Sequence, residues 1–236
     1  MQWRGSNPKV AEAPAATLSE RLQKITSDTA ALVPAERLEP VLREIGRLRT
    51  ECAAARVLKV GDAAPGFELP DHNGNLVRSA ELLAHGPVVV SFFRGRWDPY
   101  CMTELAAWKD AWPQVQAAGA SLLAISPQTA KHTGLVFQQL VTPFPILSDV
   151  GNAVARQFRV LHPISSEMRD HMLRVLINLR AYNGDDSWEL PLPATFVIAP
   201  DATIVFAFAD EDYRTRAEPA EVITLLRQLA STPGLA

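Results

Sequence analysis

Residues 87–105 read PVVVSFFRGRWDPYCMTEL, and this stretch decides the fold. Pro87 to Phe93 is a continuous apolar run rich in β-branched and aromatic residues, which is typical of a strand buried on both faces. A polar loop follows it. Asp98 and Pro99 then predict a helix start, because Asp is a favoured N-cap and Pro a favoured first helical residue. A strand that leads through a polar loop into a helix is where α/β sheets place their functional sites.

Cys101 is the candidate reactive residue of this stretch. If Asp98 is the N-cap, Cys101 is the third residue of the helix, in its first turn. The free N–H groups and the helix dipole at that position favour a thiolate over a thiol. Arg94 and Arg96 lie nearby in the sequence and can add positive potential. The alternative is that Cys101 is a leftover thiol in a scaffold without a redox role.

Alternating strands and helices surround this stretch. The pattern predicts strands at 121–128 and within FPILSDV, helices at 101–118, 129–141, 152–158, 165–180 and 218–229, and a hairpin at 194–208. Pro113 is expected to kink or divide the helix that begins near Cys101. Asn73-Gly74 predicts a tight turn between two short strands. The order of the elements predicts an α/β sandwich.

The N-terminal part of the chain has a different texture. Residues 1–16 are rich in Ala and Pro without periodicity, and we interpret them as a flexible arm. Apolar residues at helical spacing, with Pro34 between them, predict two helices in a helical extension over 17–56. The main domain is then expected over 57–236. Cys52 falls in the extension, either as an ordinary helix residue or as a partner that resolves oxidised Cys101.

Composition limits the classes of function. The chain has 236 residues, a formal net charge of −3 and no basic cluster, which argues against nucleic acid as a partner. We expect no membrane association and a cytoplasmic location, because neither a secretory leader nor a long apolar run is apparent. The histidines lack the spacing of metal ligands, so we expect no metal and no cofactor.

RGRWDPYCMTEL resembles the active-site segment of peroxiredoxin-like proteins of the alkyl hydroperoxide reductase/thiol-specific antioxidant (AhpC/TSA) family. One branch of that family has Arg-Gly-x-Trp-Cys-Pro-Tyr-Cys followed by a Glu-Leu helix. Matching residues here are Arg94, Gly95, Trp97, Pro99, Tyr100, Cys101, Glu104 and Leu105. Further similar blocks are KVGDAAPGFELP, LAISPQT, FPILSDVGNAVARQF, YNGDDSWELPLPATFVI and RAEPAEV, so that the resemblance covers about residues 58–229.

The resemblance implies a thioredoxin-like, peroxiredoxin-type three-layer sandwich and a thiol-dependent peroxidase. Cys101 is then the cysteine that attacks hydrogen peroxide or an organic hydroperoxide, and an external thiol of the thioredoxin or glutathione type reduces it. Relatives of this fold often dimerise, so a homodimer is possible. The supporting residues that the resemblance implies are Arg94, Trp97, Pro99, Tyr100, Glu104 and Pro193.

Two positions depart from the pattern of the family. Asp98 stands where the branch has the first cysteine of its Cys-Pro-Tyr-Cys and where most peroxiredoxins have a threonine that helps to bind the peroxide. Pro193 stands where most peroxiredoxins have an arginine near the thiolate, and it resembles the cis-proline of thioredoxins. The alternative is therefore a redox-silent or repurposed module on this scaffold, either for binding or for acid–base chemistry at Asp98.

The individual side chains of the site each have two interpretations at this point. Asp98 is either a helix cap or a group that accepts a proton from Cys101 or the substrate. Trp97 and Tyr100 either shape a pocket wall or simply pack. Arg94 either stabilises a thiolate or pairs with Asp98 or Glu104.

Overall fold

The computed structural model of the chain describes residues 16–231. The arm expected over 1–16 therefore lies, except for its last residue, outside the described part. Within that part, no helix is both long and apolar enough to cross a membrane.

A five-stranded sheet forms the centre of the molecule, in the order β5-β4-β3-β8-β9. Strands β3, β4 and β5 are parallel, whereas β8 is antiparallel to β3 and β9 is antiparallel to β8. These strands are β3 (Val88–Phe92), β4 (Ser121–Ser126), β5 (Ile146–Ser148), β8 (Ala194–Ile198) and β9 (Ile204–Ala209). Two small two-stranded sheets accompany it, β1 (Glu68–Pro70) with β2 (Leu76–Arg78) and β6 (Leu161–Pro163) with β7 (Glu189–Pro191).

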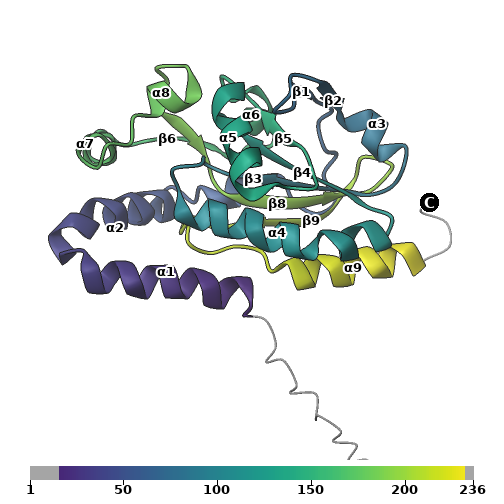
Figure 1. The fold of residues 1–236 in the computed structure, drawn as a ribbon, viewed down its shortest axis with the longest axis horizontal. Helices are drawn as coiled ribbons and strands as arrows, with labels where there is room; N and C mark the ends of the chain where they lie inside the picture. The colour runs from purple at the N-terminus through teal and green to yellow at the C-terminus, as the bar shows by residue number, and fades with distance from the viewer. Residues whose placement is uncertain (1–15, 232–236) are drawn as a thin grey trace, which may run out of the picture.

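Helices accompany the strands in the alternating order that the sequence predicts. They are α1 (Leu18–Leu32), α2 (Ala35–Thr50), the short 3-10 turn η1 (Ala54–Arg56), α3 (Ser79–Leu83), α4 (Pro99–Ala117), α5 (Ala130–Leu140), α6 (Ala153–Gln157), α7 (Ser166–Arg174), α8 (Leu179–Asn183) and α9 (Pro219–Ser231). Figure 1 shows α4 and α9 side by side along one side of the sheet. The expected α/β sandwich is confirmed.

Strand β3 separates the two halves of the core. All five of its residues are buried, and successive side chains point to opposite faces of the sheet. Val90 and Phe92 belong to one apolar cluster, which α6 and the segment after α2 complete. Val89 and Phe93, the residue directly after β3, belong to a second cluster. This cluster also contains Cys101 and Trp108 of α4 and the buried face of α9. The continuous apolar run in the sequence thus reflects burial on both sides.

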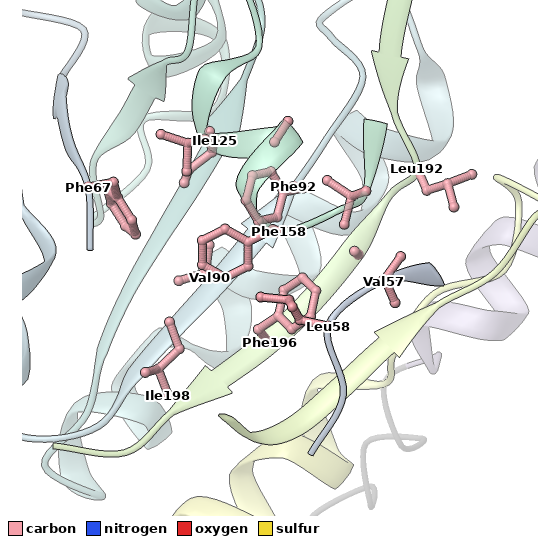
Figure 2. Close-up of a cluster of buried hydrophobic side chains, with 14 of the residues drawn as sticks. Val57, Leu58, Phe67, Val90, Phe92, Ile125, Phe158, Leu192, Phe196 and Ile198 are labelled. Carbon is pink, nitrogen blue, oxygen red and sulfur yellow. The ribbon is translucent and has the colours of Figure 1, made fainter. Parts of the chain in front are cut away.

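Aromatic rings form the middle of the first cluster (Figure 2). Phe92 and Phe196, on neighbouring strands, meet edge to face with ring centroids 6.0 Å apart. Phe158, directly after α6, packs against both, at 5.1 and 5.2 Å. This packing holds β3 and β8 in register and so supports the loop that leaves the C-terminal end of β3.

The two N-terminal helices pack on the rest of the chain rather than extending from it. Helix α1 lies along α4 and α2 lies against α7. Thr17 caps α1 through a capping box with Glu20, and Pro34 separates the two helices as expected. The division of the chain at residue 57 stays a prediction.

One local expectation was wrong, and so was part of a second. The helix expected over 165–180 ends at Arg174, because Leu176 adopts a left-handed backbone with φ of 63°, and a new helix begins at Leu179. Pro113 does not divide α4, which continues unbroken to Ala117. Packing of α4 against the sheet, α1 and α9 outweighs the loss of one backbone hydrogen bond at Pro113.

Candidate active site

The loop after β3 and the first turn of α4 form the candidate site. Asp98 is the N-cap of α4, and its Oδ1 accepts a hydrogen bond from the backbone N–H of Tyr100 at 2.9 Å. Pro99 is the first residue of the helix, so Cys101 is the third. The helix start predicted from Asp98 and Pro99 is confirmed.

Three groups surround the sulfur of Cys101, which is fully buried. The thiol donates a hydrogen bond to Oδ2 of Asp98 at 3.0 Å. The backbone N–H of Arg94 lies 3.4 Å from Sγ, and Nη2 of Arg216 lies 3.5 Å from it. The sulfur therefore faces one carboxylate and two donors.

Arg216 reaches the sulfur from the segment between β9 and α9, far from Cys101 in the sequence. Its Nε donates to Oε2 of Glu104 at 2.7 Å, and both side chains are almost completely buried. The hydroxyl of Ser91 donates to the other oxygen of Glu104 at 3.2 Å. Ser91 points toward α4 because side chains alternate along β3. Glu104 thus holds Arg216 against the sulfur.

Arg94 closes the site from another direction. Its Nε and Nη2 donate to Oδ2 of Asp98 at 2.8 and 2.6 Å. Its guanidinium lies over the ring of Tyr213 at 3.6 Å and near the ring of Trp97 at 5.0 Å. Of the two interpretations of Arg94, the structure shows the ion pair with Asp98, while its backbone N–H faces the sulfur.

Burial and charge determine the protonation states of Cys101 and Asp98. Burial raises the pKa of Cys101, the Asp98 carboxylate raises it further, and together they bring it to about 12 in spite of Arg216 and Arg94. Burial opposes ionisation of Asp98 as well, but Arg94 and Arg216 outweigh it and lower the pKa of Asp98. Near neutral pH the site therefore holds a protonated thiol against a carboxylate.

The alkylation rate of Cys101 tests this state. In a Cys52→Ser background, the rate with iodoacetamide is expected to rise about tenfold per pH unit, because only the thiolate reacts and its fraction grows in this way below the pKa. The rise should continue toward the pKa of about 12 as long as the protein stays folded. A plateau between pH values of about 7 and 9, where an ordinary cysteine titrates, would contradict the buried thiol.

Helix α1 covers the site on its outer side. The hydroxyl of Tyr100 lies 3.1 Å from Oγ1 of Thr26, and Leu18 and Leu22 pack on Tyr100 and Ala107. The ring of Tyr100 also meets Tyr213 edge to face, with centroids 5.4 Å apart. Tyr100 therefore connects the reactive helix to α1.

The structure corrects the expectation that Pro193 follows a cis peptide bond, as the cis-proline of thioredoxins does. No peptide bond between residues 16 and 231 is cis, so the bond before Pro193 is trans. The N–H of Leu192 donates to the carbonyl of Val160 at 2.7 Å, which holds the chain extended as it enters β8 and suits a trans bond. Pro193 instead lines a small cavity together with Arg94 and Tyr213. An arginine from another segment, Arg216, lies beside the sulfur, with Nη2 at 3.5 Å from Sγ.

Cys52 lies apart from this arrangement. It is exposed just after α2, with a left-handed φ of 51°, and neither cysteine is in a disulfide. Among residues 16–231, no group of three or more His, Cys, Asp or Glu side chains could hold a metal ion.

Sequence reasoning missed Arg216, Tyr213 and Ser91 as residues of the site. Arg216 falls in RAEPAEV, one of the blocks that carried the family resemblance, but neither spacing nor periodicity connected it with Cys101. Tyr213 and Ser91 had no signal of their own.

The AhpC/TSA family model matches residues 60–207, which is more than half of the chain. The chain belongs to the AhpC/TSA family. It is 33% identical over 103 residues to a putative peroxiredoxin of Mycobacterium tuberculosis, covering 44% of this chain and 67% of the relative. It is 34% identical over 115 residues to chloroplastic peroxiredoxin Q of Oryza sativa, covering 49% of this chain and 51% of the relative. Membership makes this AhpC/TSA protein a peroxiredoxin-type oxidoreductase.

Solved structures support the same fold. The crystal structure of peroxidoxin BcpB from Mycobacterium tuberculosis superimposes with a TM-score of 0.57 at 25% identity, covering 73% of this chain and 98% of the other. A PrxQ mutant of Xylella fastidiosa gives a TM-score of 0.58 at 17% identity, covering 74% and 98%. The expected thioredoxin-like, peroxiredoxin-type fold of this AhpC/TSA protein is confirmed. The matched residues 60–207 include neither α1 nor Arg216.

Proposed function

We propose that this protein reduces hydroperoxides through Cys101, with Asp98 as the group that moves the proton. The observation that carries the proposal is the contact of a single sulfur with both a carboxylate, 3.0 Å away, and a buried arginine, 3.5 Å away. The family supplies the class of reaction, and these contacts suggest how one local cysteine performs it.

The proton path follows from the hydrogen bond between Cys101 and Asp98. Asp98 accepts the thiol proton while the sulfur attacks the terminal oxygen of the hydroperoxide. A sulfur–oxygen bond forms, the oxygen–oxygen bond breaks, and the departing oxygen takes the proton from Asp98. Cys101 is oxidised to a sulfenic acid, and the hydroperoxide is reduced to an alcohol or, from hydrogen peroxide, to water.

Positive groups stabilise the charge that develops in this step. Nη2 of Arg216 and the N–H of Arg94 face the sulfur as it loses its proton. Buried charges and dipoles that are already oriented stabilise a transition state more strongly than exposed ones. Glu104 acts as a positioning residue because it holds the guanidinium of Arg216 in place.

An external thiol then completes the cycle in this proposal. One thiol attacks the sulfenic acid and releases water, and a second thiol releases Cys101 and leaves with the first as a disulfide. Because Cys52 is exposed while Cys101 is buried, the proposal assigns the reduction to an external thiol of the thioredoxin or glutathione type. Two unpaired cysteines also suit a cytoplasmic location, which belongs to the same proposal. A homodimer stays a prediction.

The buried, protonated thiol favours a second candidate. A cysteine with a pKa of about 12 and no exposed surface is unlike a ready nucleophile. A redox-silent or repurposed module on the same fold would have these properties. In such a module Asp98 would serve as the cap of α4 or as an acid–base group.

Stopped-flow oxidation separates the two candidates. Reduced wild-type protein is mixed with hydrogen peroxide or an organic hydroperoxide, with Cys101→Ser as the matched control, because serine keeps the size and polarity of the side chain. Consumption of peroxide by the wild type alone supports the peroxidase. Equal rates for the two proteins would rule it out and leave the redox-silent module.

A further inference from the structure

The buried sulfur of Cys101 raises the question of how a substrate reaches it. Two spaces approach the site from different sides. One is a cavity beneath α2, and the other is a groove between α1 and residues 212–216. They differ in size and polarity, and in the group that separates each from the sulfur.

The cavity beneath α2 is small and mainly apolar. Its volume is about 20 Å³, which is room for roughly one water molecule. Ile45, Met168 and Met172 are among the apolar residues of its wall. Arg94 is the part of its wall nearest the site, and the guanidinium is held by Asp98 on one side and by the ring of Tyr213 on the other. At this volume the cavity is too small to admit a hydroperoxide, whose two oxygen atoms need more room than one water molecule.

The groove beside α1 is larger, and its lining is more polar than that of the cavity. Its volume is about 330 Å³, and its walls include Gln23 and Thr26 from α1 and Thr215 from the facing segment. Arg216 also lines the groove, and Nη2 of the same side chain lies 3.5 Å from Sγ of Cys101. The groove therefore approaches the sulfur through the residue that already contacts it.

The geometry points to this groove as the access route to Cys101, with α1 as one of its two walls. A groove of about 330 Å³ has room for the hydroperoxide of the proposed function. This inference rests on the proposed function for its substrate, but the access route can be tested without it. Both walls of the groove, α1 and residues 212–216, lie outside the family match at 60–207.

The contacts of α1 suit a wall that can move. The N–H groups of Leu18 and Ser19 donate to the carboxylate of Glu218 at 3.1 and 2.6 Å. The Arg21–Asp110 ion pair and the contact between Thr26 and Tyr100 also hold the helix. Its buried apolar contacts belong to one small cluster, in which Leu18 and Leu22 pack on Tyr100 and Ala107. Elements with few buried contacts open more readily than the core. A small displacement of α1 would expose Arg216, the residue that separates the groove from the sulfur.

A tryptophan placed in the groove tests the route. We would compare Gln23→Trp with Lys24→Trp, because the two positions are neighbours on α1 but only Gln23 lines the groove. Both variants carry Cys52→Ser. Oxidation of Cys101 by hydrogen peroxide and its alkylation by iodoacetamide should each slow about tenfold in Gln23→Trp, a change of about 1.4 kcal/mol in the barrier. Lys24→Trp should match the parent protein in both reactions.

The two reactions distinguish failure of the route from failure of the proposed function. If the parent protein does not react with peroxide but Gln23→Trp still slows alkylation, the function is wrong and the route stands. If alkylation is equally fast in both variants and in Ser19→Trp, which fills the same groove at another point, the route is wrong.

Discussion

Asp98→Asn is expected to slow the oxidation of Cys101 by hydrogen peroxide about 100-fold, which lies within the range of general acid–base catalysis. Asparagine cannot accept the thiol proton, yet it remains a good helix N-cap, so α4 should begin where it does now. Stopped-flow oxidation of the reduced variant measures the effect. Asp28→Asn, an exposed carboxylate on α1 that pairs with Lys24, is the control and should leave the rate unchanged.

Alkylation of the same variant should change in the opposite direction. After burial, the Asp98 carboxylate is the next cause that raises the pKa of Cys101. Removing its charge lowers that pKa, so more thiolate is present at a given pH and iodoacetamide reacts faster. Slower oxidation together with faster alkylation identifies Asp98 as the proton carrier. If both reactions accelerate, Asp98 only suppresses the thiolate, and the proposed proton path is wrong.

Arg216→Met is expected to reduce the free energy of unfolding by about 3–5 kcal/mol, because it leaves the buried Glu104 carboxylate without its partner. The variant should also raise the pKa of Cys101 further, since Arg216 is the largest of the charges that lower it. Urea denaturation measures the first effect, and the pH dependence of alkylation measures the second.

Two further variants make the test of Arg216 specific. Arg227→Met removes an exposed guanidinium on α9 that donates to Gln114, and it should change the free energy of unfolding little. Adding Glu104→Gln to Arg216→Met removes the unpaired carboxylate and should restore part of the lost stability. A loss no larger than that of Arg227→Met would show that the ion pair does not stabilise the fold.

Local patterns made much of the fold predictable. Strand β3 was recognisable because a strand buried on both faces needs apolar residues at every position. The start of α4 was recognisable because capping depends on a few neighbouring residues. The helix expected over 165–180 failed because the left-handed turn at Leu176 has no glycine to announce it. The division of the helix at Pro113 was wrong because tertiary packing keeps α4 continuous.

Only those residues of the candidate site that lie close together in the sequence were predictable. Asp98 and Cys101 are three residues apart, so one helical turn brings them together. Arg216 comes from beyond β9, and its place beside the sulfur depends on how α9 and the segment before it pack on α4. Tyr213 and Thr26 likewise arrive through the packing of distant segments.

The protonation state of Cys101 also depends on tertiary structure and not on local sequence alone. From the sequence, the first turn of a helix favoured a thiolate. In the structure, complete burial and the neighbouring Asp98 carboxylate outweigh the helix start and raise the pKa to about 12.

The sequence by itself thus determined the family, the α/β fold and the position of Cys101 three residues after its N-cap, since local spacing and local propensities encode them. Only the tertiary structure decided which arginine faces the sulfur, whether the thiol is ionised, and that α1 covers it. These properties depend on distances between segments far apart in the chain and on the removal of water from around them. Neither these distances nor this loss of water can be predicted from a short stretch of sequence.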